Sequence, residues 1–435
     1  MFKYLKNLIS DTHPLRLFFH KIKAILAAVI YNFPANKMIV IGVTGTKGKS
    51  TTTNLIASIL TEAGFKVGMT STINFQVADE KWVNDKKMTT LSPFKINSLL
   101  YKMYKAGCKY AVLEVSSHSV TQSRIWGINF DVAVLTNIAP EHIEYHGSYD
   151  AYLKAKAGLF KKVMKSKRKA NVPKVFVLNS DDKEYAYFNQ FIADKKISFG
   201  LKNATVYADE INKRASGSDF YVNIPNDRFK IELSLPGEFN VLNALASISV
   251  AIAFDIHPEL IKKAFLNIKG VSGRFERIEL GQDFDVIVDY AHTEESLEAL
   301  LSLYSSVKKN RLIVVFGCTG GGRDKAKRPK MGAVADKYAD LIVLTDDDPY
   351  EEDENEIIEQ ISKGISRKEG ENFWKITDRK EAIFLALKEA QKDDIVVVAG
   401  KGAEEIIMLK DGAHKWNDRE VIKEIIESEI IVNLR

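Results

Sequence analysis

The sequence predicts an α/β protein with two domains in series, each built on a mostly parallel β-sheet. Two series of short, β-branched apolar runs alternate with stretches of helical spacing, which is the pattern of buried parallel strands joined by helices. The first series starts near residue 38 and the second after residue 270. The 435 residues, 46% of them hydrophobic and 27% charged, are typical of a folded chain and argue against long disordered segments.

Residues 1–36 are expected to form a helical extension at the N-terminus. Apolar residues recur there three or four positions apart, as on one face of a helix, at Leu15, Phe18, Ile22, Ile25, Val29 and Phe33. We expect this face to pack against the rest of the chain, and the alternative is a peripheral membrane contact. The longest clean apolar run, residues 24–31, is too short to span a bilayer.

Residues 37–270 are interpreted as the central domain. Strands are predicted at residues 38–43, 109–115, 130–138 and 175–178, and helices at 51–63 and 241–254. Residues 204–236 alternate polar and apolar side chains between turn signals, so a small antiparallel insertion is expected there.

Residues 271–435 are interpreted as a second α/β domain. Its predicted strands are residues 286–289, 312–316, 341–345 and 395–399, each followed by a polar or glycine-rich loop. Ligands in such sheets bind beyond the carboxyl ends of the strands, so these loops are where functional residues are expected.

Charge and cysteine content exclude several classes of protein. The net charge of +5 comes from the N-terminal forty residues, where six Lys and Arg minus one Asp also give five. The remaining chain is neutral overall and predicts no nucleic-acid partner, because phosphate-backbone binding requires clustered cations. Two cysteines cannot build a disulfide framework, so a reducing, cytoplasmic location is expected.

The strongest local signal is a glycine-rich segment between a predicted strand and a predicted helix. It contains Gly45, Thr46, Lys47, Gly48, Lys49, Ser50 and Thr51. Such a turn surrounds phosphates with backbone N–H groups, while the Lys reaches the terminal phosphates and the Ser hydroxyl binds Mg²⁺. Val43 stands where the common pattern has its first Gly. The segment predicts a nucleotide site and hence a P-loop ATPase domain, while the series of strands and helices after residue 270 is interpreted as a Rossmann-like C-terminal domain.

Several further motifs follow in a fixed order. They are Glu-Val-Ser-Ser-His at residues 114–118 with downstream Gln122 and Arg124, Asn-Ile-Ala-Pro-Glu-His at 137–142, Tyr-Leu-Lys-Ala-Lys at 152–156, Gly-Arg-Phe-Glu at 273–276 and Asp-Tyr-Ala-His at 289–292. Together with the glycine-rich segment they resemble the Mur ligases, the ATP-dependent amino-acid-adding enzymes of peptidoglycan synthesis. Within that family the pattern is most similar to the MurE branch, which adds the third residue of the peptide.

The resemblance implies a function and a set of site residues. It implies ATP, Mg²⁺, a carbamylated Lys156, a nucleotide-linked peptide acceptor and a free amino acid. The implied catalytic residues are Lys49, Glu114, His142 and Lys156, and the implied metal ligands are Ser50, Glu114, His142 and Lys156. Beyond the glycine-rich segment, ATP is expected at Asn243, Arg274, Asp289 and Tyr290. Substrate is expected at Thr89, Thr90, Ser116, Gln122, Arg124, Asp347, Asp348 and Glu404.

The residues themselves support some of these roles better than others. Amide formation from a carboxylate needs a leaving group, which ATP supplies through an acyl phosphate, so the site must hold cations around phosphate. A carboxylate ending a buried strand, as Glu114 does, would be costly without a partner. Mg²⁺ prefers oxygen ligands, so spacing alone favours a structural role for His142. Asp289 could serve only a loop turn, Lys156 could be a surface residue, and His118 is expected to be structural.

The sequence also departs from the family. Only residues 1–36 precede the central domain, where family members carry a domain for the uridine diphosphate. Members that add diaminopimelate carry Asp-Asn-Pro-Arg, whereas residues 347–350 here are Asp-Asp-Pro-Tyr. Asp346 to Asp348 and Glu404, opposed by Lys401 alone, suit an amine-bearing side chain better than a diacid. A ligase for another acceptor, such as a polyglutamate or pseudomurein-type peptide, and a non-catalytic nucleotide-binding subunit remain alternatives.

Overall fold

The computed structural model describes residues 13–84, 88–268, 270, 272–322 and 324–430. The chain divides into two compact units. The first contains the described residues up to Asn212 together with Ser218–Leu233 and Glu238–Ile268, and the second contains Lys213–Gly217, Ser234–Gly237 and the described residues after Ile268. Each unit has helices around a mostly parallel sheet, so the predicted α/β class is confirmed.

An eleven-stranded sheet forms the first unit. In spatial order its strands are β11 (Asp227–Leu233), β10 (Gly217–Ile224), β9 (Val206–Arg214), β8 (Lys195–Gly200), β7 (Val175–Asn179), β6 (Val132–Leu135), β1 (Ile39–Thr44), β5 (Tyr110–Glu114), β2 (Val67–Thr70), β3 (Asn74–Val77) and β4 (Glu80–Val83). The strands from β9 to β2 pair in parallel. The antiparallel pairing expected within residues 204–236 is present between β10 and β11. Phe199 of β8 pairs in parallel with Val206 of β9, so this segment also extends the main sheet.

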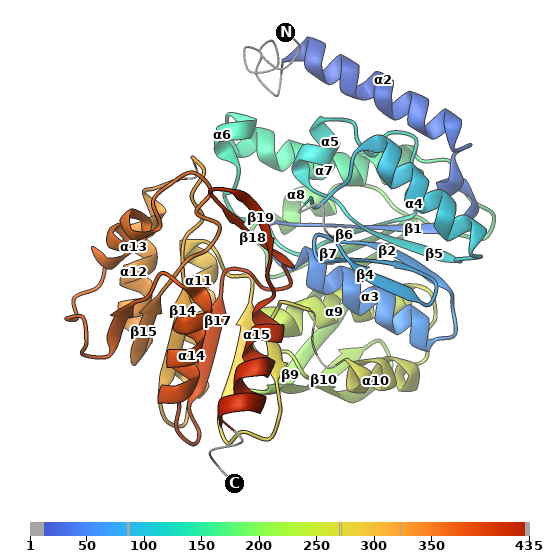
Figure 1. Ribbon diagram of the computed structural model, residues 1–435. Helices are drawn as coiled ribbons and strands as arrows, with labels where there is room; N and C mark the ends of the chain where they lie inside the picture. Colours follow the sequence, from blue (N-terminus) through green and yellow to red (C-terminus); the bar gives the residue numbers. More distant parts are fainter. Residues whose placement is uncertain (1–12, 85–87, 269, 271, 323, 431–435) are drawn as a thin grey trace. The chain divides into compact units, whose positions relative to one another are not determined.

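Helices cover both faces of this sheet. Their bounds are α2 (Pro14–Ile30), the 3₁₀ turn η1 (Pro34–Lys37), α3 (Lys49–Glu62), α4 (Pro93–Lys105), α5 (Ser117–Thr121), α6 (Ile143–His146), α7 (Tyr149–Lys165), α8 (Tyr185–Asn189), α9 (Glu238–Ala253) and α10 (Pro258–Asn267). Figure 1 shows α3 and α9 on one face, with α4, α5 and α7 on the other. Between the α4–α7 layer and the strands lies a core that includes Leu100, Phe130 and Phe160.

The turn between β1 and α3 is the part of the fold that positions the nucleotide site. Five of the six residues of β1 are buried. A Cβ on Gly42 in this strand would lie 2.9 Å from both Leu159 and Phe130, so glycine lets the core close over the strand. The chain turns at Gly48, whose φ of 80° favours glycine, and α3 begins at the next residue.

Helix α2 is present as predicted, but the prediction of its packing face was wrong. Leu15, Phe18 and Val29 are 59%, 59% and 57% exposed. Ala24 and Ala28 are instead fully buried. Small side chains let the helix approach its neighbours closely, and a Cβ on Gly127 would lie 2.6 Å from the Cβ of Ala28. The buried face of α2 is therefore the one whose small side chains allow close backbone approach, and it is not the face with the largest apolar residues.

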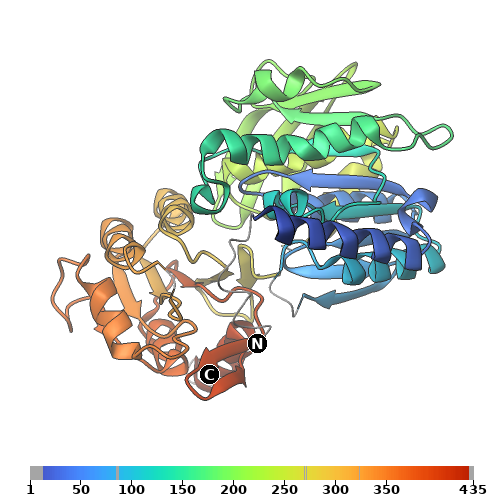
Figure 2. The same cartoon turned by 90° about the horizontal axis from the view of Figure 1, so that it is seen from above.

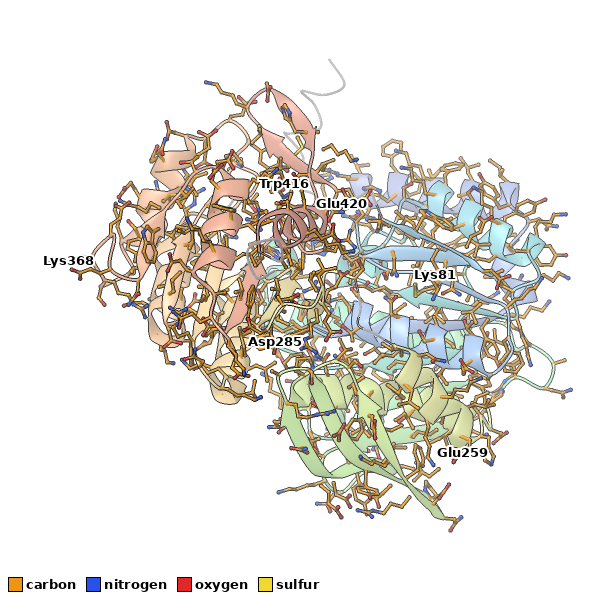
Figure 3. The ribbon with its side chains drawn as sticks, turned by 60° about the horizontal axis from the view of Figure 1, so that its bottom comes forward. Lys81, Glu259, Asp285, Lys368, Trp416 and Glu420 are labelled. Atoms are coloured by element: carbon orange, nitrogen blue, oxygen red, sulfur yellow. The ribbon has the colours of Figure 1, made fainter. Side chains whose placement is uncertain are left out.

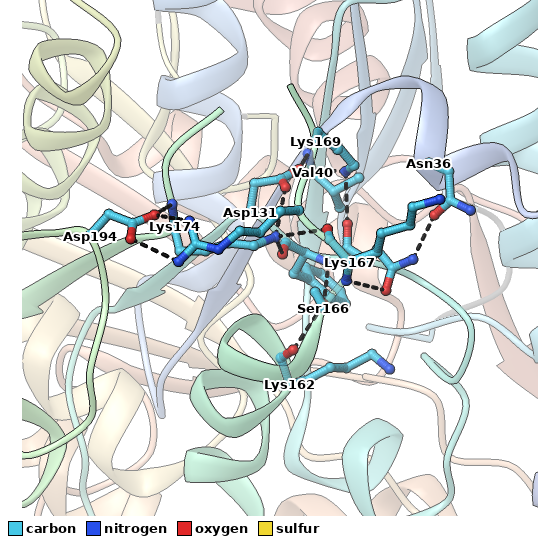
Figure 4. Close-up of polar contacts among 12 residues, drawn as sticks. Asn36, Val40, Asp131, Lys162, Ser166, Lys167, Lys169, Lys174 and Asp194 are labelled. Carbon is cyan, nitrogen blue, oxygen red and sulfur yellow. Dashed lines mark hydrogen bonds and ion pairs between the residues drawn. The ribbon is translucent and has the colours of Figure 1, made fainter. Parts of the chain in front are cut away.

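A buried ion cluster ties together the beginnings of three strands (Figure 4). Asp131, fully buried just before β6, accepts hydrogen bonds from the backbone N–H of Val40 at 2.9 Å, from Lys174 Nζ at 3.0 Å and from Lys169 Nζ at 2.5 Å. Val40 lies in β1 and Lys174 directly precedes β7. The cluster therefore fixes the amino edge of the sheet, opposite the glycine turn.

The second unit is built on a six-stranded sheet. Its strands, in spatial order, are β12 (Glu276–Ile278), β13 (Asp285–Asp289), β17 (Ile395–Ala399), β14 (Leu312–Phe316), β15 (Leu341–Leu344) and β16 (Phe373–Lys375). Helices α11 (Glu294–Val307), α12 (Lys327–Tyr338) and α13 (Glu354–Ser362) pack on one face, and α14 (Arg379–Glu389) and α15 (Asp418–Ile425) pack on the other. The strands after β12 pair in parallel, as predicted.

Two short elements complete the second unit. The hairpin β18 (Ile406–Leu409) and β19 (Gly412–Lys415) leads into α15, and the π-helical turn η2 (Ile426–Ile430) follows α15. Trp416 and Glu420 mark the start of α15 in Figure 3. The indole N–H of Trp416 donates to Asp418 at 2.7 Å. Across the described residues no helix is long and apolar enough to cross a membrane.

Candidate active site

The glycine turn after β1 has a shape that neighbouring side chains enforce. A Cβ on Gly48 would lie 2.2 Å from Asn243 Oδ1, and a Cβ on Gly45 would lie 1.9 Å from Thr136 Oγ1. Thr46 and Lys47 donate their backbone N–H groups to the carbonyl and side-chain oxygens of Asn137, at 2.8 and 2.9 Å. The N–H groups available for phosphate are therefore those that open α3, at Lys49, Ser50 and Thr51, because the first turn of a helix leaves its donors without intrahelical partners.

Two side chains of this first turn lie where phosphate chemistry needs them. Lys49 folds back over the turn and donates from Nζ to the carbonyl of Thr46 at 2.7 Å. Ser50 donates from Oγ to Glu114 Oε2 at 2.8 Å. Lysine at this point supplies a movable cation, and the hydroxyl and carboxylate together form a pair of hard oxygen ligands.

Glu114, at the carboxyl end of β5, is 1% exposed and is held by hydroxyl and amide donors. Thr72 donates its N–H to Oε2 at 2.7 Å and its hydroxyl to Oε1 at 3.0 Å. No arrangement of three His, Cys, Asp or Glu side chains able to hold a metal ion occurs in the described parts of the chain. The donor set of Ser50 and Glu114 instead fits Mg²⁺, which usually takes one or two protein ligands and completes its shell with phosphate oxygens and water.

His142 lies in a group of aromatic rings close to this edge of the sheet. It has a left-handed φ of 55° and lies between Glu141 and Glu144, with carboxylates 3.8 Å from its ring nitrogens. Its ring centroid is 4.7 Å from that of His118. Burial, with help from His142 and His146, lowers the pKa of His118 to about 4, so His118 is neutral at pH 7. His118 thus contacts a predicted site residue, although the sequence suggested only a structural role.

Lys156 projects from α7 to the glycine turn. Its side chain is buried, and Nζ donates to the carbonyl oxygen of Gly45. Among the described residues no carboxylate lies within ion-pair distance of this ammonium. Burial, reinforced by the positive charge of Lys49, holds the pKa of Lys156 well below its usual value. The alternative of a plain surface lysine is therefore wrong.

Five predicted substrate residues form one hydrogen-bonded network in the first unit. The hydroxyl oxygen of Thr89 lies 3.0 Å from that of Thr72, whose proton is donated to Glu114. Ser116 donates its N–H to Thr90 Oγ1 at 3.2 Å, and Arg124 Nη1 donates to the Thr90 carbonyl at 2.7 Å. Gln122 accepts from Arg124 Nε at 2.8 Å. The network begins next to Glu114 and so is continuous with the proposed phosphate site.

The remaining predicted nucleotide residues are divided between the two units. Asn243 belongs to the first, where its side chain lies against Gly48 and accepts from Thr52 at 3.3 Å. In the second, Arg274 stacks over the ring of Tyr290, 4.9 Å from its centroid. Asp289 is buried and accepts the backbone N–H groups of Phe275 and Ala291, each at 2.8 Å, and burial raises its pKa. Asp289 therefore orders the loop that carries Arg274.

The acidic group expected to bind the amino acid is less open than its sequence suggests. Lys401, fully buried, lies 2.7 Å from both Asp348 and Glu404 and offsets their charge. Arg379, also buried, donates to the backbone carbonyl of Asp346 at 2.8 Å. The guanidinium of Arg379 is itself paired with buried Asp418 at 2.8 Å, so it does not change the net charge of the group. Asp347 is the exception, since its buried Oδ2 has no hydrogen-bond partner among the described residues.

Asp346 and Asp347 differ from ordinary surface acids in their protonation. Burial, followed by the negative charge of Glu354, raises the pKa of Asp346 to about 7. Burial also raises the pKa of Asp347, against the opposing charges of Lys401 and Arg379. A ligand that brought an ammonium group to these carboxyls would favour their charged forms.

Sequence reasoning missed Thr72 and the bracing pair Thr136 and Asn137. Thr72 follows β2, which lies next to β5 in the sheet, so a polar residue at this strand end was a usable signal once the strand order was known. Thr136 directly follows β6, the other neighbour of β1. The order β6-β1-β5-β2 brings all these strand ends together, and that order is a property of the fold.

Comparison with known proteins places this geometry in a family. The model of the Mur ligase middle domain matches residues 43–251, and that of the Mur ligase glutamate ligase domain matches residues 273–402. The chain belongs to the Mur ligase family. Mur ligases are ATP-dependent, ADP-forming amide ligases that use Mg²⁺, and the protein is an enzyme of this class.

Three relatives illustrate the similarity of this Mur ligase to others. A UDP-N-acetylmuramoyl-L-alanyl-D-glutamate–2,6-diaminopimelate ligase of Clostridium tetani is 39% identical over 94% of the chain and 81% of the relative. The ligase of the same name from Caldanaerobacter subterraneus subsp. tengcongensis is 40% identical over 93% and 81%. A solved structure of such a ligase, 31% identical, covers 90% of this chain and 79% of its own, with a TM-score of 0.67.

Proposed function

We propose that the protein adds the third amino acid of the peptidoglycan peptide to a UDP-MurNAc-dipeptide-type acceptor. The observation that carries this proposal is one hydrogen-bonded network. Ser50 and Thr72 donate to the Glu114 carboxylate. The Thr90 hydroxyl donates to the Glu114 backbone carbonyl at 3.2 Å, and the Thr90 carbonyl accepts from Arg124. It joins groups suited to phosphate and metal to groups suited to a polar peptide. Relatives at 39–40% identity bear the name of ligases with this acceptor.

The reaction divides into two steps with defined tasks for the residues. The acceptor carboxylate takes the γ-phosphoryl group of ATP, giving an acyl phosphate and ADP, and the amine of the incoming amino acid then displaces phosphate to form the amide. Lys49 and the first N–H groups of α3 bind and orient the phosphates. Mg²⁺, held by Ser50 and Glu114, would offset the charge of the transferred group. Arg124 is suited to hold the acceptor peptide.

Lys156 completes the site in this proposal as a carbamate. A neutral amine attacks CO₂, forming an N–C bond and releasing a proton, and the product is an anionic oxygen ligand in place of a cation. The depressed pKa of Lys156 supplies the neutral amine. With His142, such a carbamate would provide ligands for a second Mg²⁺. Asn243, Arg274, Asp289 and Tyr290 are proposed for the nucleoside part of ATP.

The amino acid is proposed to carry an amine rather than a second carboxylate at its far end. Tyr350 takes the place where the family pattern has the Arg that pairs with the distal carboxylate of diaminopimelate. Asp347 offers a buried oxygen without a partner, which an ammonium group would satisfy. A cytoplasmic location is expected, and both cysteines, Cys108 and Cys318, are buried free thiols.

The test is amino-acid-dependent phosphate release with ATP, Mg²⁺ and UDP-MurNAc-dipeptide, with product masses determined. Lys49→Ala should lower the rate by ~10²-fold or more, because it removes a cation from developing phosphate charge. Lys66→Ala, which truncates an exposed lysine beyond the end of α3, is the matched control and should leave the rate unchanged. Near-normal release in the Lys49→Ala variant would refute the assignment.

The same assay separates the substrate proposals. Lysine and diaminopimelate supplied together at equal concentration should give mainly the lysine adduct. A predominant diaminopimelate adduct would overturn the argument from Asp347 and Tyr350 while leaving the ligase assignment intact. Phosphate release without any amide product would instead favour a different acceptor.

A further inference from the structure

Helix α2 has two faces of opposite character. Ala24, Ala27 and Ala28 are fully buried, and the helix packs against α4 with this small-residue face. The opposite face carries six large apolar side chains that are 50–66% exposed, namely Leu15, Phe18, Phe19, Leu26, Val29 and Ile30. Figure 1 shows α2 as the outermost helix on this side of the sheet, and Figure 2, seen from above, shows it in front of the sheet.

The exposed residues form one continuous stripe. Their spacing of three, four, seven and eight positions keeps them on one side of the helix, and half-buried Ile22 falls in the same row. Exposed apolar side chains scattered singly are normal for a folded protein, but a contiguous stripe along a whole helix marks an interaction surface.

Contacts at the carboxyl end of α2 prevent the stripe from turning inward. Phe33 packs against Trp126 with ring centroids 6.5 Å apart, and Tyr31 packs against Tyr101 of α4 at 6.0 Å. Gly127, with a φ of 79°, leaves just enough room for Ala28. The orientation of α2 is thereby fixed by packing on its inner face.

Positive charge flanks the stripe, and within the described residues of α2 and α4 there is no acidic side chain to offset it. Lys21 and Lys23 are exposed and flank the stripe on its two sides, at the angles set by the helical repeat. The sequence contains no Asp or Glu from residue 13 to residue 37, nor from 93 to 105 in α4. Helix α4 adds exposed Lys95, Lys102 and Lys105 beside α2.

We propose that α2 binds flat on a lipid bilayer that contains anionic lipids. The apolar stripe lies in the boundary between headgroups and acyl chains, and the flanking lysines extend along it to the lipid phosphates. A second copy of this chain is a poor occupant, because face-to-face stripes would bring Lys21 and Lys23 of two copies together. The proposal concerns a surface separate from the ligase site and does not depend on the proposed reaction.

The experiment is co-sedimentation of the full chain with vesicles at physiological salt. Equimolar phosphatidylglycerol and phosphatidylcholine should pellet the protein, phosphatidylcholine alone should not, and raising the salt should release it. Lys21→Gln and Lys23→Gln should each weaken partitioning by about fivefold, as expected for one cation near an anionic surface. Lys410→Gln, at an exposed lysine in the second unit, is the matched control and should bind as the parent does.

The stripe is tested by Phe18→Ser combined with Val29→Ser. This variant should bind vesicles about tenfold or more weakly. Ile192→Ser, which removes an apolar side chain that is 74% exposed elsewhere in the first unit, should bind normally. Amino-acid-dependent phosphate release reports that each variant is folded. If the stripe variant fails to fold, the two lysine variants decide the question.

Three results would overturn the proposal. The first is equal binding of the parent protein to neutral and anionic vesicles, and the second is a loss of less than twofold in the combined Lys21→Gln/Lys23→Gln variant. The third is a concentration-dependent dimer without vesicle binding that the stripe variant abolishes, which would assign the surface to a second copy of this chain.

Discussion

Two lysines are buried at opposite edges of the same sheet, and they differ in what surrounds their ammonium groups. Lys156 and Lys174 are 2% and 3% exposed, so burial does not distinguish them. Lys174 donates from Nζ to Asp131 at 3.0 Å and to the carbonyls of Phe130 and Lys167 at 2.8 and 3.3 Å. Lys156 donates to the carbonyl of Gly45 and has no carboxylate within ion-pair distance among the described residues.

The difference separates a lysine that serves stability from one that serves chemistry. A buried cation that is paired with a carboxylate and hydrogen-bonded fixes the elements that carry the pair. A buried cation without such a partner loses its proton readily and becomes a nucleophilic amine. The amino edge of the sheet therefore holds a structural cluster, and the carboxyl edge holds a group ready to react.

Lys156→Ala should give the largest effect on activity and little effect on stability. Ligation should fall by ~10²-fold or more, because the proposed carbamate would no longer supply an anionic oxygen. Short carboxylic acids added in solution should restore part of the rate, since they can place an oxygen anion in the space left. Phosphate release and urea unfolding of the same preparation measure the two effects.

Two controls test whether the effect of Lys156→Ala comes from loss of the proposed carbamate. Lys156→Arg keeps a positive charge that cannot be carbamylated, so added carboxylic acids should not rescue it. Removing CO₂ from the assay should slow the parent enzyme and leave Lys156→Ala unaffected. Full parental activity without CO₂ would count against the carbamate while leaving the comparison of the two lysines intact.

Lys174→Met should show the opposite pattern. It leaves buried Asp131 with Lys169 as its one cationic partner among the described residues, and removing one member of a buried ion cluster costs about 3–5 kcal/mol of unfolding free energy. Activity per folded molecule should be unchanged at a permissive temperature, because the cluster lies away from the glycine turn. Urea unfolding combined with phosphate release provides the measurement.

A second substitution distinguishes loss of the ion cluster from loss of packing. Asp131→Asn combined with Lys174→Met removes both charges and should recover part of the lost stability. The loss of unfolding free energy in the double variant is compared with the sum of the losses in Asp131→Asn and Lys174→Met. If the two were equal, there would be no coupling energy between the charges, and Lys174 would contribute by packing only.

The sequence was sufficient to predict the fold class and the succession of most strands and helices along the chain. Buried parallel strands are recognisable in the sequence as runs of β-branched residues. The glycine turn at residues 45–48 separates the end of β1 from the start of α3. Periodicity failed for α2, because it reports that one face is apolar and cannot report that three alanines allow a closer approach.

From the sequence, only those site residues that lie in recognisable motifs could be predicted. Lys49, Ser50 and Glu114 lie in motifs, and the structure brings Ser50 and Glu114 into contact. The roles of Thr72 and Asn137 depend on which strands are neighbours in the sheet, which no local pattern contains. The pairing of Lys401 with both Asp348 and Glu404 also escaped prediction, since charge counts along the chain do not show which acid faces which base.

Lys162, on the same helix as Lys156, is a less deeply buried lysine with which the comparison of Lys156 and Lys174 can be extended. The effect expected from its substitution is the smallest of the three. Burial alone lowers its pKa to about 8, below the usual 10.5. Between these two values the unfolded chain binds more protons than the folded chain, so the parent protein should gain stability as the pH rises from about 8 to 10.5. Below pH 8 the full cost of burying the charged group is present.

Lys162→Met removes this cost and should raise the unfolding free energy by about 1 kcal/mol at pH 7, because partial exposure screens much of the effect. The gain should shrink as the pH rises and vanish near pH 10.5, where the parent lysine is neutral in the folded state. Lys161→Met, at the exposed neighbouring position, should show no such pH dependence. Urea unfolding at several pH values compares the two variants. If the gain in unfolding free energy persisted unchanged at high pH, methionine would stabilise the protein by packing. Burial of the charged Lys162 would then carry no free-energy cost, and the contrast with Lys174 would hold for Lys156 alone.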